Sequence, residues 1–211
     1  MRDRNRVGQA DGFSLIELIA VIAIFGIVAT MIVPPIQQMI HRSKIEGFAN
    51  ASALMIQQAR FEAIKRSIPC VVQPDVANGR MFAFADVHGT AVTDPPDGIF
   101  NPIAAAPFRT TDYRIQEQSF PSGLSFAAPG FTGLASVDGF VNAGAPDKQA
   151  ILQADGSALS AGAIRVADVR GNFLEIRIAP AATARVQIRK WSPDDSAWLA
   201  SGELDKPWEW M

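Results

Sequence analysis

Residues 12–18 read Gly-Phe-Ser-Leu-Ile-Glu-Leu and open an almost wholly apolar stretch that continues to residue 33. The run carries no charge from residue 18 onward, and with residues 13–16 it reaches the roughly 20 residues that a helix needs to cross a bilayer. A secretory signal peptide has a shorter apolar core followed by a small-x-small cleavage site, and neither feature fits here. The stretch therefore predicts a helix that is retained as a membrane anchor over about residues 13–34.

Glu17 is the one charge inside this stretch. A carboxylate at mid-bilayer costs about 2.5–3.5 kcal/mol on insertion scales, so a compensating partner is expected. If the chain is cut between Gly12 and Phe13, the new α-ammonium of Phe13 lies one helical turn from Glu17, and a carboxylate also suits a helix N-terminus. These two charges can pair within a subunit or between neighbours. The alternative is a glutamate at the membrane interface that extends into the headgroups.

Residues 12–18 resemble the cleavage and methylation motif of type IV pilins and type II secretion pseudopilins. This resemblance implies that residues 1–12 are a leader removed by an aspartyl prepilin peptidase, with the cut between Gly12 and Phe13. It further implies N-methylation of Phe13 and a Glu17 that neutralises the ammonium of an adjacent subunit during assembly.

Pro34 falls where these families often carry a helix-kinking proline, and Pro35 follows it directly. Two adjacent prolines remove helix hydrogen bonds and clash with the preceding turn, so a kink or a locally melted stretch is expected. The leader is mildly basic, but Arg42 and Lys44 lie beyond the other end of the span, so charge alone sets no topology. The motif implies a single-pass protein of the bacterial inner membrane, with a cytoplasmic N-terminus and a periplasmic domain after about Pro35.

Past the prolines, an apolar stripe predicts that the helix continues to about Arg66, where Ile68-Pro69 ends it. A helix over residues 13–66 would be about 80 Å long, too long for a small domain to cover, so its first half needs partners elsewhere. In a filament, those partners are the same segments of other subunits. The stripe recurs at three- and four-residue steps and consists of Ile45, Phe48, Ser52, Met55, Ala59 and Ala63.

After Pro69, short runs of β character alternate with Gly, Pro, Asn and Asp clusters, which indicates an antiparallel β domain over residues 69–191. The clearest hairpin joins residues 163–169 and 173–178 through a tight turn, and residues 184–191 can add a third strand. The sequence thus predicts an α+β, pilin-like fold in which a long N-terminal helix packs on a C-terminal antiparallel β domain. Further strands are predicted at residues 70–73, 80–85, 113–118, 123–127 and 150–153.

Residues 59–66 and the late β region resemble the GspH/FimT family of minor pilin-like proteins. The plainer interpretation of residues 59–66 is a solvated helix end, with Glu62 and Arg66 one turn apart. Residues 87–149 match the family less well and are predicted to form long loops and short strands. Residues 94–98 carry two carboxylates, but a polar turn is a better prediction than a calcium loop because the EF-hand spacing is missing.

Alternation in the late strands places apolar residues on one face and Arg177, Arg185 and Arg189 on the other. The basic stripe is a candidate contact for DNA or a protein partner, because the FimT branch of the family binds DNA through a Gly-Arg-x-Arg motif. The matching residues 184–187 keep one arginine and lose both the glycine and the second arginine. An ordinary solvated face is therefore the preferred interpretation.

Residues 192–211 form an acidic tail rich in tryptophan, and two interpretations of it stay open. The tail can be strapped over the sheet, or it can present an aromatic docking surface to a neighbouring subunit.

A net charge of −2 gives no global footprint of nucleic-acid binding, and the single cysteine, Cys70, excludes an intramolecular disulfide. Cys70 is predicted to be a small buried residue. The chain shows no catalytic carboxylate pair, nucleophile triad, zinc spacing or phosphate loop, so we predict no enzyme activity, no metal and no cofactor.

The leading hypothesis is a minor pseudopilin resembling protein H of type II secretion systems, which joins the periplasmic pseudopilus and assists protein export across the outer membrane. Its expected partners are prepilin peptidase, other pseudopilins in a helical filament, inner-membrane lipid and the inner-membrane assembly platform. The alternatives are a FimT-like minor pilin that binds DNA for natural transformation, or a minor subunit of a type IV pilus. The single cysteine disfavours an ordinary adhesive pilus subunit, because it denies the usual bridge.

Overall fold

The computed structural model describes residues 13–87, 96–100, 112–141 and 148–200 together with Trp208 and Trp210, apart from the side chains of residues 30–35 and 131. The predicted leader, including Gly12, lies outside this part. So do residues 94 and 95 of the acidic turn and much of the predicted tail.

Helix α1 (Leu15–Arg66) is 52 residues long. The chain divides into two compact units, residues 1–40 and 41–211, and the boundary between them falls within this helix. The predicted helix end at Arg66 is confirmed. Ser67 follows with φ 56°, a left-handed conformation that commonly terminates helices, and Pro69 prevents their continuation.

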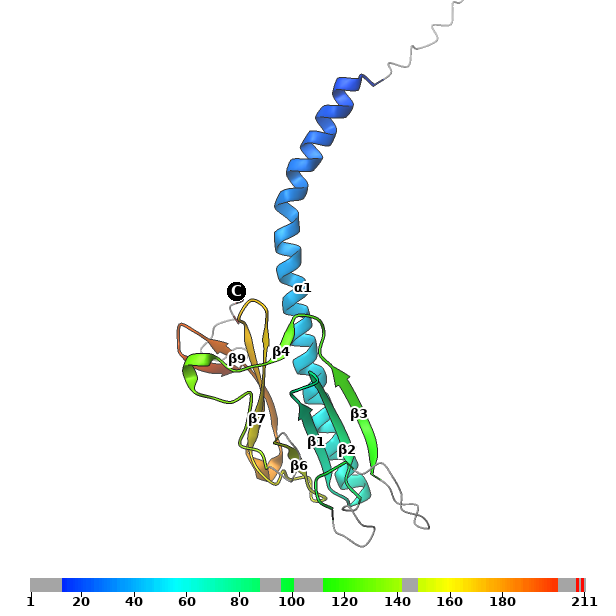
Figure 1. Cartoon of the computed structure of the whole chain (residues 1–211), viewed down its shortest axis with the longest axis vertical. Coiled ribbons are helices and arrows are strands. Elements are labelled where there is room, and N and C mark those ends of the chain that lie inside the picture. The colour runs from blue at the N-terminus through cyan, green and yellow to red at the C-terminus, as the bar shows by residue number, and fades with distance from the viewer. Residues whose placement is uncertain are drawn as a thin grey trace, which may run out of the picture. The chain divides into compact units, whose positions relative to one another are not determined.

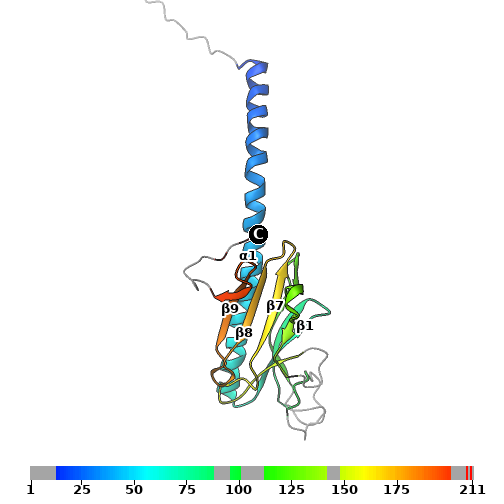
Figure 2. The same ribbon diagram turned by 90° about the vertical axis from the view of Figure 1, so that its left-hand side faces the viewer.

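The second unit contains two antiparallel sheets, which Figures 1 and 2 show alongside the cyan part of α1. Sheet A has the strand order β3-β2-β1-β6, and sheet B has the order β10-β9-β8-β7-β4, with β5 also paired to β7. The strands of sheet A are β1 (Cys70–Asp75), β2 (Arg80–Ala85), β3 (Tyr113–Ser119) and β6 (Ala150–Leu152). Those of sheet B are β4 (Leu124–Phe126), β5 (Val137–Asp138), β7 (Gly162–Asp168), β8 (Phe173–Ile178), β9 (Val186–Ser192) and β10 (Ala197–Ala200).

One hydrophobic cluster joins α1 to both sheets. The predicted stripe on α1 is buried throughout, and it packs with residues such as Val72 of β1 and Ile176 of β8. Phe48 is 1% exposed, and its ring lies 4.4 Å from that of Phe120. Cys70 is fully buried as predicted, and burial raises the pKa of its thiol to about 12. The predicted α+β architecture, a long N-terminal helix and an antiparallel β domain, is therefore confirmed.

All eight predicted strands are present, and two of them, β2 and β8, have the predicted bounds. The turn between β7 and β8 is built by Asp168, whose Oδ1 accepts hydrogen bonds from the backbone N–H groups of Arg170 and Asn172 at 2.9 Å each. The third late strand begins at Val186 instead of residue 184, because Ala184 has φ 44° and ends a short 3-10 turn, η2 (Ala181–Thr183). Two short strands, β5 and β10, were not predicted.

Candidate functional site

Ser14 and Glu17 form a capping box at the start of α1. Ser14 Oγ accepts a hydrogen bond from the Glu17 backbone N–H at 3.2 Å, and Glu17 Oε2 accepts one from the Ser14 backbone N–H at 3.2 Å. This reciprocal pair satisfies backbone donors that the helix itself leaves without partners. This role of Glu17 was not predicted from the sequence, although Ser-x-x-Glu spacing is the usual signature of a capping box.

The large apolar side chains before and after this cap are exposed in the described part of the first unit. Their exposed fractions run from 44% for Val28 to 87% for Phe13. Among the residues that the structure describes, no helix combines the length and the apolarity needed to cross a bilayer. The transmembrane part predicted over residues 13–34 includes residues 30–34, whose side chains lie outside the described part.

Glu17 is exposed, and the ion pair predicted between it and the Phe13 ammonium stays a prediction because the chain here is uncut. Its Oε2 bonds Ser14, while the other carboxylate oxygen has no partner among the described residues. Pro34 and Pro35 both lie within the helical span of α1. The kink predicted at these prolines also stays a prediction.

A ladder of alternating charges crosses sheet B from β5 to β9. Arg165 of β7 donates hydrogen bonds from Nη1 to Asp138 Oδ2 at 2.5 Å and from Nε to Glu175 Oε2 at 2.8 Å. Arg189 of β9 donates from Nε to Glu175 Oε1 at 3.1 Å. Glu175 is fully buried, and both of its oxygens are held by guanidinium groups, which offsets the desolvation of the carboxylate.

This ladder corrects the predicted solvent-facing stripe of Arg177, Arg185 and Arg189. Arg189 is half-buried and bound to Glu175, whereas Arg177 is half-buried and Arg185 exposed, neither with an ion-pair partner in the described part of the chain. Strand alternation predicted the correct face for Arg189, but it did not predict that the neighbouring strands place Glu175 and Arg165 on the same face. The predicted hairpin turn fixes the pairing Arg165↔Glu175, but the pairing Glu175↔Arg189 depends on the connection from β8 through η2 to β9.

The described tryptophans of the tail region pack on their own domain. Trp191 and Trp198 face each other in neighbouring strands, with ring centroids 5.4 Å apart. Trp208 donates a hydrogen bond from Nε1 to the carbonyl oxygen of Leu199 at 3.2 Å. Trp210 lies near two cations, 5.1 Å from the Arg42 guanidinium and 5.2 Å from the Lys190 ammonium. These contacts favour the strapped tail over the free docking surface.

Asp86 is a buried carboxyl group next to the acidic turn. Its Oδ2 accepts a hydrogen bond from the Gly98 backbone N–H at 2.6 Å, and its Oδ1 has no hydrogen-bond partner in the described part of the chain. Burial raises the pKa of Asp86 to about 6; the Gly98 N–H opposes this rise, and the nearby Asp112 and Asp97 carboxylates add to it. Asp97 Oδ1 accepts a hydrogen bond from the Ile99 N–H at 2.8 Å, as in a polar turn. Within the described residues, no group of three His, Cys, Asp or Glu side chains is placed to hold a metal ion.

The N-terminal segment matches a family model described as the prokaryotic N-terminal methylation motif, over residues 9–33. The match includes Gly12, Phe13 and Glu17. The chain therefore carries a prepilin-type N-terminal motif ahead of an α+β fold.

Among solved structures, the chain is similar to the minor pseudopilin EpsH from the Type 2 Secretion System of Vibrio cholerae. The two share 14% sequence identity with a TM-score of 0.42, over 71% of this chain and 98% of EpsH. No curated protein sequence matches the chain.

Proposed function

We propose that this chain is a minor pseudopilin of the GspH/FimT type, a structural subunit of the type II secretion pseudopilus that assists protein export across the outer membrane. The observation that carries the proposal is the prepilin-type motif placed directly before an exposed apolar helical segment. In this proposal, prepilin peptidase cuts between Gly12 and Phe13, and Phe13 is N-methylated. Residues 13–34 then anchor the chain in the inner membrane, with the β-rich domain in the periplasm.

Assembly transfers the exposed apolar side chains of the first unit from lipid to the segments of neighbouring subunits. Glu17 guides this step. One of its oxygens stays on the Ser14 N–H and keeps the first helical turn intact, since the cut leaves that peptide group in place. The other oxygen accepts the ammonium of Phe13 from an adjacent subunit, so the charge is neutralised where water is excluded.

Deleting the gene tests the proposal. Export of type II substrates should fall, and it should be restored by the wild-type gene but not by the Glu17→Val variant, which inserts into the membrane but assembles poorly. Mass spectrometry of the assembled protein should find N-methyl-Phe13 as the first residue. Unchanged export together with lost DNA uptake, or an intact Met1 in assembled protein, would contradict the proposal.

A second candidate function is DNA binding in natural transformation. Exposed Arg185 favours it, as does Arg177, which has no ion-pair partner among the described residues. The pairing of Arg189 with Glu175 weakens it, because that arginine is removed from the basic stripe. Binding of the full chain, held in nonionic detergent, to duplex DNA should then weaken steeply as salt is added. Absence of binding at low salt would remove this function.

A further inference from the structure

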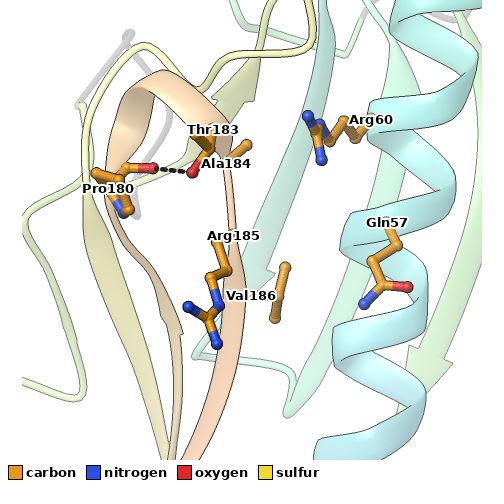
Figure 3. A pocket seen from close by; sticks show the side chains of 7 residues that line it. All are labelled: Gln57, Arg60, Pro180, Thr183, Ala184, Arg185 and Val186. Atoms are coloured by element: carbon orange, nitrogen blue, oxygen red, sulfur yellow. Dashed lines mark hydrogen bonds between the residues drawn. The ribbon is translucent and has the colours of Figure 1, made fainter.

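A groove of about 740 Å³ lies between α1 and the start of β9, within the second unit (Figure 3). Arg60 and Arg185 are the cations of its lining. Arg60 Nε donates a hydrogen bond to the carbonyl oxygen of Gly156 at 2.7 Å, and the guanidinium of Arg185 points away from Arg60. The two cations therefore do not converge on one ligand, and the groove by itself identifies no occupant.

A short segment, residues 96–100, is docked on the other side of the unit, on the face of sheet A that points away from α1. Strand alternation places Phe84 and Asp86 on this face, because Ala85 between them belongs to the cluster that contains α1. The ring of Phe100 lies edge-on to the ring of Phe84, with centroids 5.2 Å apart. One end of the segment is therefore held on the sheet by an apolar contact.

Two buried side chains hold the backbone of Gly98 in the middle of this segment. Asp86 Oδ2 accepts a hydrogen bond from the Gly98 N–H at 2.6 Å, and Gln149 Nε2 donates one to the Gly98 carbonyl oxygen at 2.8 Å. Asp86 is 2% exposed and Gln149 is fully buried. Because water does not replace these partners, the position of the segment depends on both bonds.

The surroundings of Asp86 disfavour its charged form. Its Oδ1 is buried and has no hydrogen-bond partner in the described part of the chain. Burial is the main reason that the pKa of Asp86 rises to about 6; the Gly98 N–H opposes the rise, and the carboxylates of Asp112, before β3, and of Asp97, in the segment, add to it. From β1, the Cys70 thiol also lies near Asp86, but burial raises its pKa to about 12 and keeps it neutral.

We propose that ionisation of Asp86 loosens the docked segment, residues 96–100, and that protonation of this carboxyl holds the segment in place. A buried carboxylate with two others nearby is stabilised when water reaches its unbonded oxygen, and displacement of the segment admits that water. The neutral carboxyl still accepts the Gly98 N–H and does not need the water. The fold thus contains a proton-dependent contact on the outer face of sheet A. This inference does not depend on the proposed place of the chain in a secretion system.

Hydrogen exchange at the Gly98 amide tests this proposal in the full ¹⁵N-labelled chain, held in nonionic detergent micelles. The displaced segment leaves Asp86 in water with an ordinary pKa of about 3.9, so displacement becomes easier as the pH rises through 6. After correction for the intrinsic exchange rate, the protection of the Gly98 amide should fall about tenfold between pH 5 and 7.5. The reference is the Phe120 N–H, which donates to the Gly79 carbonyl oxygen at 2.9 Å and should keep its protection.

Three variants separate the proton from the docking contacts. Asp86→Asn keeps an acceptor for the Gly98 N–H and cannot ionise, so its Gly98 protection should no longer change with pH. Gln149→Met removes the other hydrogen bond of Gly98 and should lower the protection about fivefold at every pH, with the pH dependence kept. Histidine ordinarily titrates in the same range, so His88→Gln is the control and should leave the dependence unchanged.

Four results would overturn the proposal. The first is a Gly98 protection that does not change with pH in the wild type, and the second is a pH dependence that persists in Asp86→Asn. The third is a dependence that disappears in His88→Gln, which would assign the proton to the histidine. The fourth is an equal fall in protection at Phe120, which would indicate unfolding of the whole unit instead of displacement of residues 96–100.

Discussion

The first half of α1 is the more apolar of the two, yet its large apolar side chains are exposed, whereas the apolar stripe of the second half is buried. Phe25, in the first unit, is 69% exposed, whereas Phe48, in the second, is 1% exposed. Both segments are helical, so helix formation alone does not decide burial. The second half has two sheets to pack on, whereas the described part of the first unit offers its side chains no core. The difference teaches that burial in α1 follows from what the chain places beside each half, and the exposed first half is what the proposed anchor and filament role requires.

The carboxylates of the two units differ in the same way. Among the described residues, Glu17 is exposed and bonded only to the backbone and hydroxyl of Ser14. Glu175 is fully buried and bonded to two guanidinium groups. A buried carboxylate needs partners within the same fold, because it has lost its contact with water. An exposed carboxylate at a helix start is solvated by water, so it can take its partner from another chain.

Truncating Phe48 gives the largest expected effect on this comparison. Phe48→Ala should lower the free energy of unfolding by about 4 kcal/mol, because it removes a buried ring and leaves a cavity beside Phe120. The matched change in the other half, Phe25→Ala, should leave it unchanged. Denaturant unfolding in detergent, followed by the fluorescence of tryptophans in the second unit, measures both. Equal losses for the two variants would show that the halves are not energetically separate.

Breaking the charge ladder should lower the free energy of unfolding somewhat less than Phe48→Ala does. Arg165→Met leaves Asp138 unpaired and Glu175 with Arg189 alone, and we expect a loss of about 3 kcal/mol in unfolding free energy. The same change at Arg177, which has no ion-pair partner in the described part of the chain, should cost less than about 0.5 kcal/mol. A loss at Arg165 no larger than at Arg177 would mean that the ladder contributes nothing to stability.

Asp86 should make the stability of the second unit depend on pH. Its pKa in the folded state is about 6, above the value of about 3.9 expected in the unfolded chain, so the folded state holds the proton more tightly between these values. The stability that this group contributes is therefore present below about pH 4 and is lost as the pH rises through 6. Asp86→Asn should be more stable than the wild type by about 3 kcal/mol at pH 7.5, with the difference becoming small near pH 4.

Unfolding curves at pH 4, 5, 6 and 7.5 measure the effect at Asp86. The exposed carboxylate of the first unit supplies the control, because Glu17→Gln should leave the unfolding of the second unit unchanged at every pH. A constant difference between Asp86→Asn and the wild type across this range would rule out a proton-linked contribution.

Local patterns were enough to predict most of the fold. Strands β7 and β8 alternate cleanly around Gly171, whose φ of 84° suits glycine, so the hairpin between them is a property of adjacent residues. β10 was missed because Asp194 and Asp195 precede it and made residues 192–211 read as a polar tail. The late start of β9 depends on the left-handed Ala184, which composition does not reveal.

The candidate sites also differ in whether adjacent residues or the folded structure bring their members together. Gly12, Phe13 and Glu17 lie within six residues of one another, so a motif can contain them. The Arg165, Glu175 and Arg189 cluster draws one residue from each of three strands, and only the register of the folded sheet brings the three side chains together. The groove at Arg60 joins residues more than 120 positions apart and had no signal in the sequence.

The smallest expected effect lies at the start of α1 and separates the two roles of Glu17. Ser14→Ala removes the hydroxyl that accepts the Glu17 N–H, which should destabilise the first helical turn by about 1 kcal/mol. Hydrogen exchange at the amides of Glu17 and Leu18, measured in micelles, should speed up about fivefold. Because the carboxylate is untouched, entry into the filament should be nearly normal, whereas Glu17→Val should impair it. If Ser14→Ala blocked assembly as strongly as Glu17→Val does, the cap itself, and not the charge, would be what assembly requires.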